Sequence, residues 1–346
     1  MEPILSVAVP APTDSGAAIT RSLIIPVYRN EANMADLIAA LTSLDETLGG
    51  GLEVVFVIDG SPDMSGAILA EALPRLPFPA KLAFHSRNFG SFAAVRTGLE
   101  LAEGDVIAGM AADLQEPPEL IVSFFDLLQR DEADIVLGVR NRRADPPLTA
   151  LLSNMFWWAY RRFVQPAMPR GGVDVFACNA KVRDVLLTIA EPNSSLIAQL
   201  FWVGFRRKFV AYDRRARTKG RSGWSWSRRL RYMFDSIISF SDLPILALLW
   251  VGAFGCVVSV LLGIATAIGR IAGVIAEPGY TSLLLTVLFF GSAILVAQGI
   301  IGCYVWRAFE NTKNRPLQIV TQVIKAPGHR QAAMETAGSG APDHAS

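Results

Sequence analysis

The sequence predicts an α/β protein: a mostly parallel sheet with helices on both faces, followed by interfacial helices and a hairpin of two transmembrane helices. Three observations predict this fold. Strands alternate with helices over the first 140 residues, two stretches near the carboxyl terminus carry no charge, and basic residues cluster before the first stretch. Charged residues make up only 18% of the 346-residue chain, against roughly 25% in soluble domains, which indicates that some apolar segments lie in lipid.

Five short apolar runs alternate with stretches of helical length. We expect strands at SLIIPV, LEVVFVI, KLAFH, DVIAGM and DIVLGV, and helices at residues 33–48, 65–73, 89–103 and 117–130. This alternation is typical of a parallel sheet covered by helices. Because ligands of such sheets bind beyond the carboxyl ends of the strands, the polar residues that follow these strands form the candidate site.

Two uncharged stretches, residues 244–268 and 280–306, are each longer than the ~20 residues that cross a hydrocarbon core. The preceding residues 206–231 include eleven basic residues and one acid, and the second stretch is also followed by basic residues. The loop between the stretches has Arg270 and Glu277 as its only charges. By the positive-inside rule, we expect a multi-pass membrane protein with the strand-and-helix domain and both termini in the cytoplasm.

These features divide the chain into segments. Residues 1–20 and 326–346 are expected to be disordered tails, 21–223 the cytoplasmic α/β domain, 224–243 a juxtamembrane amphipathic helix, 244–306 the two membrane helices and 307–325 a cytoplasmic segment. Three widely spaced cysteines indicate neither a disulfide framework nor a zinc site. Small residues in the membrane helices, such as Gly252, allow close helix packing and are compatible with a homo-oligomer.

Polar residues follow the first three strands. Asp59, after the second strand, can accept the ring N–H of a uracil or guanine; the alternative is an Asx-type turn that only closes the strand. After the third strand, Arg87 and the N–H groups at the start of a helix suit an anionic diphosphate. The alternative has Asn88 as the helix N-cap and Arg87 in solvent. We interpret His85 as a structural residue.

The fourth strand is followed by Asp113 and Gln115, and Pro117 then begins a helix. As alternate residues, Asp113 and Gln115 can point the same way and offer two hard oxygen ligands. Mg²⁺ or Mn²⁺ needs only one or two protein carboxylates when a diphosphate and water complete its coordination. The alternative is a simple strand-to-helix turn.

An ordered set of motifs resembles a known family. The motifs are PVYRNE, VIDGSPD, SRNFG followed by AAVRTGLELAEGD, AADLQEPPELI, GVRNRR, RTKGRSGW, FSDLPI and ENTKNRPLQIV. Over roughly residues 21–325 they resemble family 2 inverting glycosyltransferases of the membrane-bound polyprenyl-phosphate type, which include dolichol-phosphate mannose synthases and bacterial bactoprenol glucosyltransferases. The resemblance implies a GT-A fold, a divalent metal, and a location in the bacterial inner membrane.

The resemblance also implies roles for individual residues. Asp113 and Gln115 would hold the metal, and Asp113 and Arg217 would be catalytic. Acceptor phosphate binding falls to Arg214, Arg217 and Ser222. Donor binding falls to Pro26, Tyr28, Glu31, Asp59, Arg87, Asn88, Gly90 and Asp113. The chain departs from the family pattern at Ile58 and Ala111, where an acid is common, and at Phe176 and Ala180, where arginines are common.

The implied reaction is transfer of a hexose from UDP-glucose or a related UDP-sugar to undecaprenyl phosphate on the cytoplasmic leaflet. A phosphate monoester has a second pKa near ~6, so it is nucleophilic at neutral pH without a general base. The expected partners are a nucleotide-diphosphate sugar, a polyprenyl phosphate and the membrane, with no nucleic acid. Two alternatives are a catalytically weakened nucleotide-sugar-binding scaffold and a processive polysaccharide synthase, although no Gln-x-x-Arg-Trp motif is present.

Overall fold

The computed structural model describes residues 20–140, 161–162, 165–169, 172–191, 194–215, 243–272, 279–313 and 315–327. Nearly all of the predicted juxtamembrane helix and of the two predicted tails lies outside these ranges. The candidate residues Arg217 and Ser222 also lie outside them.

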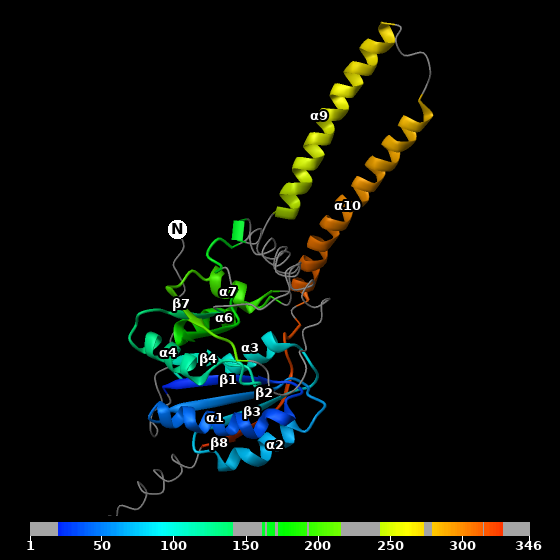
Figure 1. The fold of residues 1–346 in the computed structure, drawn as a ribbon. Coiled ribbons are helices and arrows are strands. Elements are labelled where there is room, and N and C mark those ends of the chain that lie inside the picture. The colour runs from blue at the N-terminus through cyan, green and yellow to red at the C-terminus, as the bar shows by residue number, and fades with distance from the viewer. Residues whose placement is uncertain are drawn as a thin grey trace, which may run out of the picture.

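The described residues form an eight-stranded sheet in the order β7-β5-β6-β4-β1-β2-β3-β8 (Figure 1). Strands β6 and β8 run antiparallel to their neighbours, and the other six run in one direction. These six strands therefore end together at what we call the carboxyl end of the sheet, opposite its amino end. The strands are β1 (Arg21–Val27), β2 (Leu52–Ile58), β3 (Ala80–His85), β4 (Val106–Gly109), β5 (Ile135–Arg140), β6 (Val175–Asn179), β7 (Arg207–Tyr212) and β8 (Val320–Ala326).

Helices cover both faces of the sheet. On one face lie α1 (Met34–Thr47), α2 (Ser65–Ala72) and α4 (Pro118–Gln129), which bury apolar side chains against Leu23 and Ile25 of β1. On the other face lie α3 (Ser91–Leu101), α6 (Ala180–Thr188) and α7 (Leu196–Trp202), which pack in one cluster with Ile24. Successive strand residues point to opposite faces, so the continuous apolar run in β1 serves both layers.

This architecture confirms the mostly parallel α/β sheet that the sequence predicts. Each of the five expected strands and four expected helices is present, with bounds within two residues of those predicted. Strands β6, β7 and β8 were not among the expected elements. Strands β7 and β8 extend the sheet at its two edges, and β6 lies between β5 and β4; β6 and β8 supply its antiparallel pairs.

Two long helices, α9 (Leu243–Ile271) and α10 (Tyr280–Thr312), extend away from the sheet (Figure 1). They contact each other and line an apolar groove of about 500 Å³ between Leu249 and Gly252 of α9 and Ile301 and Val305 of α10. One stretch of the described helices, Phe289–Thr312, is long and apolar enough to cross a membrane. The two-helix transmembrane hairpin therefore remains a prediction.

After α10 the chain returns to the sheet as β8, which pairs with β3. The turn that follows β3 is held by the same segment, because the Ser86 N–H donates to the Ile319 carbonyl at 3.0 Å. Thr321 Oγ1 donates to the Phe84 carbonyl at 3.1 Å, and Gln318 donates to Glu100 of α3 at 2.8 Å. The residues after the apolar helices thus complete the sheet beside one of the candidate turns.

Candidate active site

The turns after β1 and β2 are bound to each other by an acid at each turn. The Glu31 N–H donates to Asp63 Oδ2 at 3.0 Å, and the Met64 N–H donates to Glu31 Oε2 at 3.0 Å. Burial would raise the pKa of Asp63, but hydrogen bonds from Ser61, the Glu31 N–H and Ser65 outweigh it and lower that pKa. Asp63 is therefore held as a carboxylate that fixes the two turns together.

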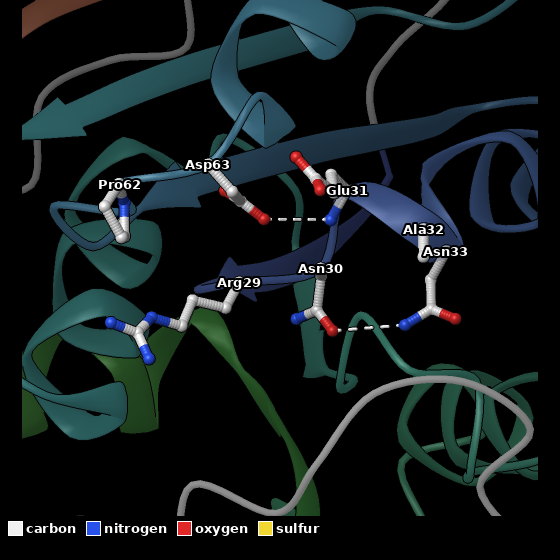
Figure 2. Close-up of a pocket in the computed structure, with 7 residues that line it drawn as sticks. All are labelled: Arg29, Asn30, Glu31, Ala32, Asn33, Pro62 and Asp63. Carbon is white, nitrogen blue, oxygen red and sulfur yellow. Dashed lines mark hydrogen bonds between the residues drawn. The ribbon is translucent and has the colours of Figure 1, made fainter.

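A cleft of about 430 Å³ opens between these turns, lined by Arg29, Asn30, Glu31, Ala32, Asn33, Pro62 and Asp63 (Figure 2). Arg29 takes a left-handed backbone conformation (φ 55°), and its guanidinium lies 5.4 Å from the ring centre of Tyr28. Of the predicted donor residues, Glu31 lines this cleft, while Pro26 lies within β1 in register with Val57.

Asp59 is almost fully buried, with 3% of its surface exposed. Its carboxylate accepts hydrogen bonds from the His85 ring at 2.9 Å and from the N–H groups of Phe89 and Gly90 at 2.8 Å each. Asn88 donates to the Asp59 carbonyl at 3.2 Å. Asp59 therefore organises the turn after β3, a function that its position in the sequence did not predict.

His85 joins Asp59 to Thr97 of α3, since its second ring nitrogen lies 2.8 Å from Thr97 Oγ1. This buried chain of contacts agrees with a structural role. The N-cap of α3 is Gly90 (φ 101°), so the alternative with Asn88 as N-cap does not describe this structure. Arg87 is exposed and lies over the Phe89 ring at 4.0 Å, with a hydrogen bond to the Asn88 carbonyl.

The turn after β4 carries two crowded carboxylates. Asp113 is 9% exposed, and Leu114 takes a left-handed conformation (φ 54°) that brings the Gln115 N–H to 3.4 Å from Asp113 Oδ1. Glu116 is 3% exposed and accepts the Ala111 N–H at 3.2 Å. Burial raises the pKa of Glu116, and the charge of Asp113 raises it further, whereas Arg214 lowers it.

The loop after β7 docks on this turn. Arg214 Nη2 donates to Gln115 Oε1 and lies 4.0 Å from Glu116 Oε1. The Arg215 N–H donates to the Gln115 carbonyl at 2.9 Å, and the Gln115 side-chain amide donates to the Arg215 carbonyl at 3.3 Å. The structure therefore brings together three predicted site residues, Asp113, Gln115 and Arg214, from positions about 100 residues apart.

Sequence reasoning missed several polar residues at the same end of the sheet. Arg140, at the end of β5, forms an ion pair with Asp174, just before β6. Burial raises the pKa of Tyr212, at the end of β7, to about 12, with Asp174 and Glu116 adding to the rise. Each of these residues lies at the end of a strand on the carboxyl side of the sheet. That position was the sequence signal by which they could have been found.

Asp113 and Gln115 fit a Mg²⁺ or Mn²⁺ ion by chemistry, because both offer hard oxygen atoms from one turn. Within the described ranges, no group of three or more His, Cys, Asp or Glu side chains is placed to hold a metal. A divalent ion here would therefore depend on few protein ligands and on oxygens of a bound substrate.

The fold and the charged turns at its carboxyl end define an α/β enzyme of the glycosyltransferase class. Residues 22–185 match glycosyl transferase family 2, and an uncharacterized glycosyltransferase of Synechocystis is 30% identical over 88% of this chain and 96% of its own length. The chain therefore belongs to glycosyl transferase family 2.

Two further proteins are similar to this chain. The SfII prophage-derived bactoprenol glucosyl transferase of Shigella flexneri is 29% identical over 86% of this chain and 96% of that protein. The mannosyltransferase PcManGT of Pyrobaculum calidifontis, solved with GDP-Man and Mn²⁺, is 17% identical, with a TM-score of 0.45 and coverage of 85% of each chain.

Proposed function

We propose that this enzyme transfers a hexose from UDP-glucose or a related UDP-sugar to undecaprenyl phosphate or a similar polyprenyl phosphate. The observation that carries the proposal is the contact between Gln115 and Arg214. It joins the turn expected to hold a metal to the basic segment that leads into the apolar helices. The similar bactoprenol glucosyl transferase of S. flexneri supports a polyprenyl acceptor.

We infer that α9 and α10 both cross the bacterial inner membrane, with the sheet domain on the cytoplasmic side. Their exposed side chains are large and apolar, including Trp250, Phe254 and Phe289. The basic residues before α9 and after α10 support a cytoplasmic location for both flanks. The carboxyl end of the sheet would then lie near the headgroups, where a lipid phosphate is available.

On the donor side, the proposal assigns the nucleotide to the turns after β1, β2 and β3. A carboxylate has about four acceptor sites, and the protein fills three of those on Asp59, which leaves about one for the ring N–H of a base. Arg87 is exposed above the same turn and can pair with a diphosphate. Tyr28, Glu31, Asn88 and Gly90 would shape the cleft around them.

Asp113 and Gln115 would hold Mg²⁺ or Mn²⁺, which supplies charge neutralisation for the departing nucleoside diphosphate. The remaining chemistry is positioning. Arg214, with Arg217 and Ser222 beyond it, would hold the acceptor phosphate in line with the anomeric carbon, and the phosphate itself attacks. A direct attack breaks the bond to the nucleotide on the opposite side, so the configuration inverts.

The test is to incubate membranes containing the chain with undecaprenyl phosphate and a panel of radiolabelled nucleotide sugars. We expect one donor to yield a labelled lipid that mild acid cleaves, and membranes without the chain to yield none. If no donor in the panel labels a lipid, the proposal is wrong.

A further inference from the structure

Arg214 binds one of the two side chains proposed to hold the metal, that of Gln115 in the turn after β4. Its Nη2 donates to Gln115 Oε1, and the Glu116 carboxylate lies 4.0 Å away. Its Nε is buried and has no hydrogen-bond partner in the described part of the chain. Arg214 therefore offsets the charge of Glu116, and its Nε–H has no acceptor among the described residues.

The same oxygen, Gln115 Oε1, is the one that the proposed function gives to a divalent ion. A Mg²⁺ ligand lies about 2.0–2.1 Å from the ion, so an ion and the Arg214 guanidinium sharing this oxygen would be only about 4 Å apart. At that distance the two positive charges repel each other, and the double charge of the ion strengthens the repulsion. Gln115 Oε1 can thus serve one cation at a time.

The loop that carries Arg214 is held independently of this contact. Arg215 binds the Gln115 main-chain carbonyl through its own N–H, at 2.9 Å, and its side chain pairs with Glu119 of α4 at 3.4 Å. Neither contact uses Gln115 Oε1. The Arg214 side chain can therefore leave the oxygen while its backbone stays beside the turn.

We propose that Arg214 is an exchangeable internal cation that holds Gln115 until the divalent ion and donor bind, and then turns to the acceptor phosphate. The inference rests on the proposed function and adds to it the order in which the two substrates bind. Donor binding releases the arginine that the acceptor needs, so the donor binds first. The crowded acids of the turn remain neutralised by one cation or the other throughout.

The experiment is a titration of the purified full chain, in detergent, with Mn²⁺ alone, in which electron paramagnetic resonance measures free Mn²⁺. Arg214→Ala removes the competing cation and is expected to tighten Mn²⁺ binding about tenfold, which corresponds to about 1.4 kcal/mol. Arg215→Ala is the matched control, because it removes the neighbouring guanidinium without exposing Gln115 Oε1, and its Kd for Mn²⁺ should stay within about twofold of the original. Thermal melting verifies that both variants are folded.

The KM for undecaprenyl phosphate gives a second readout, in which acceptor binding should weaken while Mn²⁺ binding tightens. Arg214→Ala should raise this KM even though it tightens Mn²⁺ binding, a pair of effects that a purely structural arginine would not produce. Unchanged or weaker Mn²⁺ binding in Arg214→Ala, or equal tightening in Arg215→Ala, overturns the exchange and leaves the proposed function intact. If the original chain binds no Mn²⁺ up to millimolar concentration, the metal assignment and the exchange are both wrong.

Discussion

The two ends of the sheet hold buried charges in different ways. At the amino end, Lys81 Nζ lies 2.6 Å from carboxylate oxygens of both Glu53 and Glu103 and donates to the Leu101 carbonyl at 2.6 Å. Glu53 also accepts the hydroxyl of Ser22 and the Glu103 N–H. These groups lie on the strands, at the end of α3 or in the connection between α3 and β4, so the charges are matched within the strands and their adjoining segments.

At the carboxyl end, two carboxylates share one short turn. Asp113 adds to the effect of burial in raising the pKa of Glu116, which means that the two acids repel each other. The cation beside them, Arg214, belongs to the loop after β7 and is more exposed than Lys81. The amino end therefore uses its charges to hold the fold, while the carboxyl end keeps an electrostatic conflict that a ligand can relieve.

Asp113→Asn should give the largest functional effect. It should show most clearly that the acids at the carboxyl end serve activity and not stability. The amide keeps the shape of the turn but loses the charge, so we expect kcat to fall about a thousandfold. Loss of one of two repelling acids should leave the melting temperature unchanged or higher. Initial rates of labelled-lipid formation and thermal melting measure both effects. Activity within tenfold of the original would contradict the role given to Asp113.

Lys81→Met tests the amino end. It leaves the buried carboxylate of Glu53 without its cation, and removing one partner of such a pair costs about 3 kcal/mol of unfolding free energy. Because Lys81 is remote from the candidate site, kcat per folded molecule should not change. Urea unfolding in detergent and initial rates provide the measurements. Lys325→Met is the control, since Lys325 is the exposed partner of Lys81 across β3 and β8, and it should have little effect on either quantity.

Gly60→Ala, at the carboxyl end of the sheet, and Gly49→Ala, at its amino end, test how strongly each end depends on a left-handed backbone conformation. Gly60 has φ 57°, and a Cβ there would lie 2.3 Å from the Arg87 carbonyl carbon, so we expect a loss of about 2–3 kcal/mol and a roughly tenfold higher donor KM. Gly49 has φ 74° with open space around it, so its substitution should cost only about 1 kcal/mol and leave KM unchanged. Equal effects at both sites would show that the close approach to Arg87 is unimportant.

Arg206→Ala should have the smallest effect and is best seen through its pH dependence. The hydrogen bond from Arg206 lowers the pKa of Asp134, at the amino end beside β5, below its ordinary value of 3.8. A lowered carboxyl pKa stabilises the fold above the ordinary value, and this contribution is lost as the pH falls through the lowered one. The original chain should therefore melt slightly higher than the variant at pH 7, and the difference should vanish in strong acid. A difference that grows toward low pH would contradict this assignment.

The central strands and helices could be predicted because their signals are local. Apolar runs such as LEVVFVI are long enough for a buried strand, and the helices between them keep a helical period. Strand β8 is different: both apolar helices separate it from the rest of the sheet, and its pairing with β3 depends on an edge created by the folded domain. Strand β6 has an apolar run of only four residues, Val175–Cys178, and no predicted helix precedes it, while β7 begins with two basic residues and is largely exposed.

The candidate site was predictable in position but not in its internal contacts. Parallel topology alone places Asp59 and Asp113 at one end of the sheet. No local pattern indicates that His85 and two backbone N–H groups bind Asp59, or that Arg214 binds Gln115 across 99 residues. The partners of Arg96, in the helix after Gly90, could not be predicted either. Arg96 donates to three carbonyls of residues 186–189 and so caps the end of α6.

Strand β8 also sets an order for biosynthesis. It is the last element of the sheet to leave the ribosome, after both apolar helices have been made. Until then the backbone of β3 is an open edge, and open edges invite pairing with other chains. A nascent or truncated chain that ends before residue 320 would leave this edge of β3 without its partner strand.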